Sequence, residues 1–134
     1  VKDVDFGTNH ILVREGKGAK DRRTLLPECL REPLGNQLEQ NRAQHEKDLA
    51  RGAGWVELPN AIGRKYPYAG REQAWQWVFP ATRCYLHPPA RQRRRHHYHE
   101  SALQRAVKQA VLKARILKPA TCHTFRHSFA THLL

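Results

Sequence analysis

The chain has 134 residues, enough for one ordinary domain with a single core. No apolar run reaches the roughly 18 to 20 residues that cross a bilayer, so a transmembrane protein is excluded. The three cysteines form no paired motif and argue against a disulfide framework or a zinc ribbon. With no secretory signal visible, we expect a reducing, cytoplasmic location.

The formal net charge is +12, which predicts a polyanionic partner. This charge is unevenly distributed along the chain. Residues 1–57 carry ten basic and ten acidic side chains, whereas residues 58–134 carry fourteen basic side chains and only Glu72 and Glu100 as acidic ones. The whole surplus therefore lies in the second part.

A small antiparallel sheet is predicted near the N-terminus. Two β-favouring runs, 10–15 and 22–26, flank the turn-forming segment 16–21, which is typical of a β-hairpin. Residues 4–6 are predicted to add a third strand. From Pro27 the pattern becomes helical, with leucines at 30, 34 and 38, and it predicts a long amphipathic helix that ends near Gly52.

Residues 55–90 are punctuated by glycine and proline, so the only regular element expected there is a short helix at 72–77. The segment holds all three tryptophans, which is too aromatic for a disordered linker. The basic run 91–95 then leads into a helix predicted over 100–116, with an apolar stripe and a positive exposed face. A last helix is predicted from Thr121, with Phe125, Phe129 and Leu133 on its buried face.

Three features carry candidate chemistry. The first is the hairpin turn Gly16-Lys17-Gly18-Ala19-Lys20, which is either a solvated turn or a rigid tip that holds an ammonium group against a phosphate.

The second is the run 91–95 with the histidines at 96, 97 and 99. A solvated loop and a zinc site are open alternatives there, but phosphate contact is favoured because aromatic stacking platforms for bases lie nearby.

The third feature is the pair His123 and Arg126. Positions three apart are neighbours on a helix, so both side chains can reach one group. Given nine histidines and sixteen arginines, about one H-x-x-R match is expected by chance. The surrounding residues must therefore decide whether this pair has a function.

Residues 122–134 read Cys-His-Thr-Phe-Arg-His-Ser-Phe-Ala-Thr-His-Leu-Leu. They closely resemble the H-x-L-R-H-[ST]-x-A-[ST]-x-[LM] box of tyrosine recombinases, the phage integrase family, with Phe125 at the usual leucine position. The lysine-rich hairpin looks like the family's β-strand lysine region, and the two motifs occur in the family's order. This resemblance implies an α+β, mostly helical catalytic domain with a small antiparallel sheet near its N-terminus.

Within the family, the segments Val1–Phe6, 64–67, 75–80, 94–97 and 118–121 resemble integron integrases. The resemblance implies recombination of gene cassettes, with residues 1–134 as part of the DNA breaking and rejoining domain and 55–97 as an integron-specific insertion. The chain starts with Val1 and contains no methionine, so it reads as an excerpt. The family's first arginine and its nucleophilic tyrosine are expected outside it, and we expect this chain alone not to cleave DNA.

The resemblance also assigns roles to residues. Lys17 would protonate the leaving 5′ oxygen, His123 would contact the scissile phosphate or assist proton transfer, and Arg126 would clamp the phosphate. The reaction would use no metal and no cofactor. The expected DNA-binding residues are Lys20, Arg22, Trp75, Trp77, Arg93, Arg94, Arg95, His96 and His97.

The implied partners are double-stranded attachment sites and folded single-stranded ones, whose extruded bases would stack on Trp75 or Trp77. The full-length protein would act as a tetramer on DNA in the bacterial nucleoid. For both tryptophans, core packing is the open alternative. Two other classes also stay open: a non-catalytic basic module that binds nucleic acid, and a zinc protein using His123, His127 and His132, although His132 falls on a different helix face.

Overall fold

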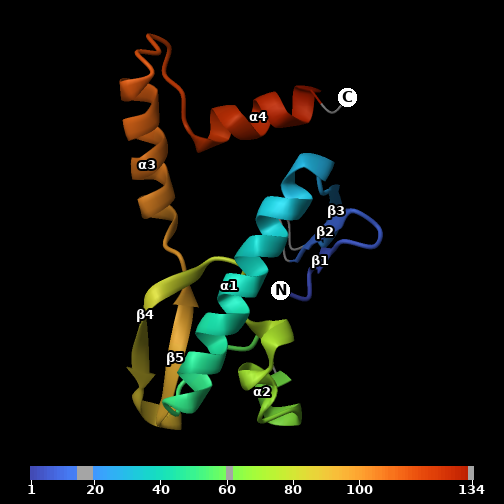
Figure 1. The fold of residues 1–134 in the computed structure, drawn as a ribbon, viewed down its shortest axis with the longest axis vertical. Coiled ribbons are helices and arrows are strands. Elements are labelled where there is room, and N and C mark those ends of the chain that lie inside the picture. The colour runs from blue at the N-terminus through green and yellow to red at the C-terminus, as the bar shows by residue number, and fades with distance from the viewer. Residues whose placement is uncertain (15–19, 60–61, 133–134) are drawn as a thin grey trace. The chain divides into compact units, whose positions relative to one another are not determined.

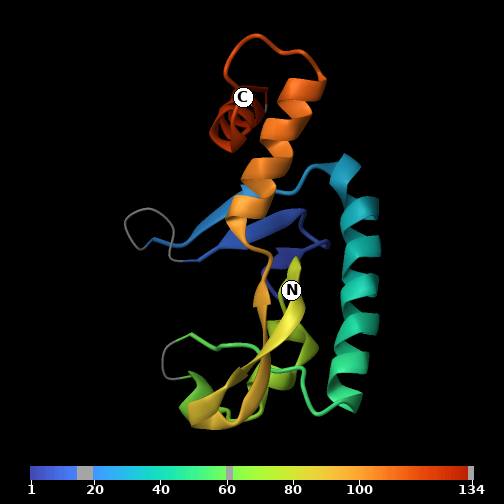
Figure 2. The same ribbon diagram turned by 90° about the vertical axis from the view of Figure 1, so that its left-hand side faces the viewer.

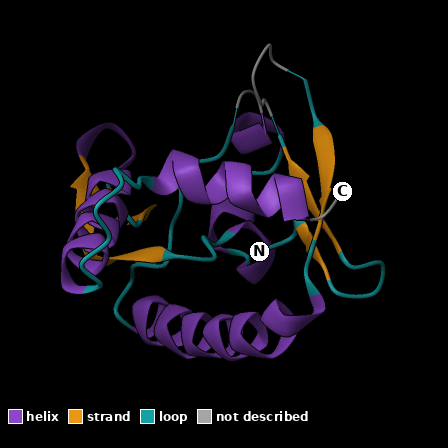
Figure 3. Cartoon of the chain, turned by 90° about the horizontal axis from the view of Figure 1, so that it is seen from above, coloured by secondary structure: helices purple, strands orange, loops and turns teal. Residues whose placement is uncertain are grey.

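The computed structural model describes residues 1–14, 20–59 and 62–132. The chain divides into two compact units, residues 1–97 and residues 98–134. Unit 1 contains both sheets, while the regular elements of unit 2, over its described residues, are helices (Figure 3).

The predicted N-terminal sheet is confirmed. It consists of β1 (Val4–Asp5), β2 (His10–Val13) and β3 (Arg22–Leu25), in the order β1-β2-β3 with both pairs antiparallel. In β2 and β3, His10 lies opposite Leu25 and Val13 lies opposite Arg22. Residues 15–19, which stand between these two strands in the sequence, lie outside the described residues, and the predicted catalytic Lys17 is one of them.

The long helix is confirmed as α1 (Arg31–Ala50), which follows a 3-10 turn at Glu28–Leu30. It ends where predicted, since Gly52 adopts a positive φ of 70° that favours glycine. Its buried face differs from the predicted leucine stripe. The buried residues are Asn41, His45 and Asp48, whereas Leu30 is 47% exposed.

A second β-hairpin corrects two expectations. Strands β4 (Pro80–His87) and β5 (Gln92–His97) pair antiparallel, so the segment up to residue 90 contains an eight-residue strand and the basic run is mainly a strand. The turn between them is a 3-10 turn, Pro88–Ala90, followed by Arg91 in the left-handed region. Arginines are poor strand signals, and here the cross-strand partner outweighs local preference.

Short turns replace the helix expected at 72–77. They are the 3-10 turns Ala69–Arg71 and Gln73–Trp75, preceded by the four-residue α2 (Ile62–Lys65). The segment at Trp55 lies beside β5 and pairs with it through an isolated parallel bridge to Arg94, in which Arg95 N donates to Trp55 O at 2.8 Å. A Cβ at Gly70 would lie 3.0 Å from Val56 O, so this close approach of two backbones requires glycine.

Helix α1 runs along unit 1 (Figures 1 and 2), and hydrogen bonds tie it to the connection between β1 and β2 and to β5. At its N-terminal end, Arg31 Nη1 donates to the carbonyl oxygen of Phe6, at 2.7 Å, and to the side chain of Asn9. At its C-terminal end it meets β5 through Asp48. The buried apolar residues of the described chain are few and mostly small: Leu26, Ala53, Val56 and Ala69.

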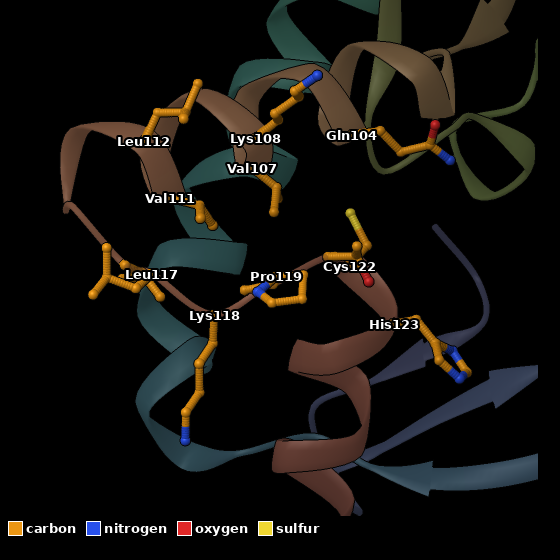
Figure 4. A pocket seen from close by; sticks show the side chains of 13 residues that line it. Gln104, Val107, Lys108, Val111, Leu112, Leu117, Lys118, Pro119, Cys122 and His123 are labelled. Atoms are coloured by element: carbon orange, nitrogen blue, oxygen red, sulfur yellow. The ribbon is translucent and has the colours of Figure 1, made fainter.

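Unit 2 consists of α3 (Glu100–Lys113), capped by the His99 side chain, and α4 (Cys122–His132). Both predicted helices are confirmed, and with the two sheets they establish the α+β class. The apolar stripe of α3 lines a groove of about 710 Å³ together with the linker to α4; Figure 4 labels Val107, Val111, Leu112, Leu117 and Pro119 among its lining residues. Among the described residues, no helix has the length and apolarity to span a membrane.

Candidate nucleic-acid interface

An aromatic cluster forms where the segment before β4 meets the end of β5. The rings of Trp77 and His96 are stacked, with centroids 6.0 Å apart and an interplanar angle of 22°. The ring of His97 meets Trp77 edge-on, at 5.2 Å, and lies 4.1 Å from His96. The structure thus brings together three residues predicted to contact DNA, and we call them the Trp77 cluster.

The indole nitrogen of Trp77 orients the ring by donating to the carbonyl oxygen of Arg95, at 3.2 Å. His96 and His97 are exposed at the end of β5, and Trp77 is half-buried. Trp75 has a different environment, because the ammonium nitrogen of Lys2 lies 3.1 Å from its ring centroid. Of the two tryptophans predicted as stacking platforms, Trp75 therefore already has one face covered.

The arginines of β5 differ in their burial and in their partners. Arg93 is exposed, and Arg94 is half-buried and donates from Nε to Gln92 Oε1 at 3.0 Å. Arg95 points inward, is only 8% exposed and forms a bidentate pair with Asp48, at 2.7 and 2.8 Å. This corrects the expectation for Arg95: its guanidinium serves the interior of unit 1, so we leave it out of the DNA-binding surface. Lys20 and Arg22 are exposed, as a DNA contact requires.

Asp48 is buried, with 5% exposure, and stays charged because of its partner. Burial opposes the carboxylate charge, but hydrogen bonding and attraction from Arg95 outweigh it and lower the pKa of Asp48 below its ordinary value. Burial raises the pKa of the nearby Cys84 thiol, so this cysteine stays protonated and unreactive.

The other buried polar residues of α1 hold the segment that leads to Trp77. Asn41 donates to the carbonyl oxygens of Trp77, at 3.2 Å, and Val78, and His45 Nε2 donates to the carbonyl oxygen of Arg71 at 2.8 Å. Because unmatched buried polar groups are costly, these bonds fix the chain path. The sequence analysis did not predict these buried polar residues. Asn41, His45 and Asp48 are spaced by four and three residues, which places them on one face of the helix, and this spacing could have indicated them.

Helix α4 carries the remaining predicted residues. Thr121 and Thr124 cap it reciprocally: Thr121 N donates to Thr124 Oγ1 at 3.1 Å, and Thr124 N donates to Thr121 Oγ1 at 3.4 Å. This cap places His123 in the first turn and Arg126 one turn later, both exposed.

Two further features of α4 were not predicted. The Nε2 atoms of His123 and His127 lie 2.7 Å apart, so one ring donates a hydrogen bond to the other. The apolar face predicted to be buried is open, with Phe125 53% and Phe129 42% exposed; the third member of that face, Leu133, lies outside the described residues. Over the described part of the chain, no cluster of three or more His, Cys, Asp or Glu residues is arranged to hold a metal ion.

Comparison with known proteins matches residues 1–134 to the phage integrase family. Two relatives, each named integrase/recombinase, come from Escherichia coli and Pseudomonas aeruginosa, and each is 52% identical to this chain over 134 residues. The match covers all of this chain and 40% of each relative, so the chain spans less than half the length of these proteins. The family match extends over every described element, from the first strand to α4, and the chain belongs to the phage integrase family.

Proposed function

We propose that this chain is part of the DNA breaking and rejoining domain of a site-specific tyrosine recombinase. The observation that carries this proposal is the family match over residues 1–134, which includes His123 and Arg126 exposed on consecutive turns of α4. The +12 net charge supports DNA as the partner.

The proposed reaction is a transesterification at a DNA phosphate. A tyrosine hydroxyl, from a segment of the recombinase outside residues 1–134, gives its proton to His123 or to water, its oxygen forms a bond to phosphorus, and the bond from phosphorus to the 5′ oxygen breaks. The leaving oxygen takes a proton from Lys17 and becomes a 5′-hydroxyl. Arg126 donates to the nonbridging oxygens, where its planar fork matches two acceptors, and His123 supports the phosphate or the proton transfer.

For the substrate, we propose integron attachment sites, including folded single strands with extruded bases. The Trp77 cluster supports this assignment, because the half-buried indole and the exposed rings of His96 and His97 offer aromatic surface that can stack on a base that has left the duplex. The basic side chains Lys20, Arg22, Arg93 and Arg94 would contact the backbone. We further propose a tetramer on DNA in the cytoplasm as the working assembly.

DNA binding by this chain is expected to weaken steeply with salt, since each phosphate contact releases counterions. Replacing the exposed Arg93 by alanine should reduce the slope of log affinity against log salt by about 1. Titration of labelled attachment-site DNA at several salt concentrations measures this slope. Arg42→Ala is the matched control, because Arg42 is exposed but paired with Glu46 at 3.4 Å in the charge-balanced part of the chain. Equal slopes for both variants would contradict the role of Arg93.

Trp77→Ala is expected to weaken binding of a hairpin with extruded bases by about 1–3 kcal/mol per stacked base, and to affect a fully paired hairpin much less. Competition between the two hairpins measures this discrimination. Trp77→Phe keeps a ring but not the bond to Arg95 O, so it separates stacking from positioning. Trp75→Ala is the control, because Lys2 already covers that ring. Unchanged discrimination in Trp77→Ala would assign this ring to packing alone.

The second candidate function is a non-catalytic module that binds nucleic acid, which the exposed basic strand β5 alone would satisfy. The two candidates differ in their dependence on α4. Only the recombinase requires Arg126 for a chemical step. In a simple basic module, Arg126→Ala would lower the affinity for nucleic acid no more than the loss of any other exposed arginine.

A further inference from the structure

The pair His123 and His127 has a geometry that the proposed recombination does not use. The two histidines are four residues apart on α4 and therefore lie one above the other on the same helix face. Their rings are perpendicular, with centroids 4.3 Å apart, and the two Nε2 atoms face each other at 2.7 Å. A hydrogen bond joins the two rings, and neutral imidazole nitrogens are metal ligands, so a change of tautomer and a small rotation would present both nitrogens to one ion.

The type of ligand indicates which metal would suit the pair. Imidazole nitrogens suit nickel, copper and zinc ions, and affinity for such sites rises along the first-row divalent ions to copper. Two ligands from one helix leave the other positions of an octahedral or tetragonal ion open.

The surroundings permit metal binding at this place. Both rings are exposed, so small rotations can turn both nitrogens toward one metal ion. Arg126, on the same helix, is the nearest cation in sequence, but its repulsion is screened at an exposed site. The described residues offer no third His, Cys, Asp or Glu to complete a closed site, so water or an external ligand would fill the remaining positions.

We propose that His123 and His127 form an open two-histidine site for a divalent cation of the nickel and copper class. The bound ion would occupy the ring nitrogen of His123. A consequence, which rests on the proposed function, is that the ion would compete with the DNA phosphate for His123 and so inhibit the recombinase reversibly.

The test is the binding of Ni²⁺ to the untagged chain. Calorimetry measures the affinity, and paramagnetic broadening of the NMR signals of the histidine rings identifies the residues that bind. Ni²⁺ is preferred to Cu²⁺ because Cu²⁺ would oxidise free thiols, and Cys29 is exposed. The parent chain and all its variants carry alanine at positions 96 and 97, so that this adjacent histidine pair does not contribute. We expect His123→Ala and His127→Ala each to weaken binding about 100-fold, because a chelate becomes a single ligand.

His132→Ala is the matched control on the same helix and should bind Ni²⁺ as tightly as its parent. Far-UV circular dichroism confirms that the exposed substitutions leave the helices intact. If neither His123→Ala nor His127→Ala binds more weakly than His132→Ala, the site is overturned. Because this binding is measured without DNA, its result is independent of the recombinase assignment.

A second titration, with attachment-site DNA, tests whether Ni²⁺ competes with the DNA. Ni²⁺ should lower the affinity of the parent chain for DNA and leave that of His127→Ala unchanged. An equal effect on both chains would overturn the inhibitory role.

Discussion

Replacing Asp48 by alanine is expected to lower the free energy of unfolding by about 3–5 kcal/mol, because it leaves the Arg95 guanidinium buried without its counter-charge. The bidentate pair links α1 to β5, at 2.7 and 2.8 Å, and Arg95 also donates to the carbonyl oxygen of Ala81 on β4. Loss of the carboxylate therefore affects the helix and the hairpin together. Urea denaturation of the chain measures the effect.

Two controls separate this pair from a general loss of charge. Arg93→Ala, at an exposed position of the same strand, should change the free energy of unfolding by no more than about 0.5 kcal/mol. The double variant Asp48→Leu/Arg95→Met should recover most of the lost stability, since an apolar pair of similar size leaves no buried charge. An Asp48→Ala variant as stable as Arg93→Ala would show that the buried pair contributes little.

The same pair predicts a pH dependence. Because the pKa of Asp48 is lowered in the folded state, its contribution is complete above the ordinary value of 3.8 and is lost as the pH falls through the lowered pKa. The difference in stability between the natural chain and Asp48→Ala should therefore narrow only in strongly acidic solution.

Replacing Arg126 by alanine is expected to slow DNA strand cleavage by about 10²- to 10³-fold, the usual effect of removing one donor from a developing oxyanion. The measurement requires a complete recombinase. This chain can be placed in the Escherichia coli relative in exchange for the 134 matching residues, which are 52% identical. The rate at which protein becomes covalently attached to an attachment-site DNA then reports cleavage.

Arg126→Lys separates charge from geometry, since it keeps the positive charge but loses the planar fork, and its rate should fall between those of the natural protein and Arg126→Ala. Arg105→Ala, at an exposed position of α3, is the control for general electrostatics. If Arg105→Ala slows cleavage as much as Arg126→Ala, Arg126 has no special place in the reaction and a general basic surface explains the effect.

Local sequence patterns predicted the elements whose residues interact mainly with their neighbours in the chain. The glycine- and lysine-rich turn between two β-favouring runs predicted the β2–β3 hairpin, and the stop at Gly52 predicted the end of α1. In α4 the start at Thr121 was predicted as well, since a capping threonine acts within one turn. Periodicity failed for the buried face of α1, because that face packs through hydrogen bonds and one ion pair.

The β4–β5 hairpin could not be predicted from its own residues. A run of arginine and histidine does not mark a strand, and β5 is a strand because it pairs with β4 across the turn 88–91. Tertiary contacts also decide which arginine is buried. Arg93, Arg94 and Arg95 look equivalent in the sequence, and strand alternation places Arg93 and Arg95 on the same face of β5. Arg95 pairs with Asp48 on α1 and is buried, whereas Arg93 is exposed.

The sequence by itself determined the family, the excess of positive charge after residue 57 and the residues of the α4 box, because these depend only on composition and on short motifs. The tertiary structure decided which of the candidate residues act together. It joined Trp77 to His96 and His97 and assigned Arg95 to Asp48. The physical reason is that contacts between side chains depend on strand register, rotamers and burial, which arise only when distant segments pack.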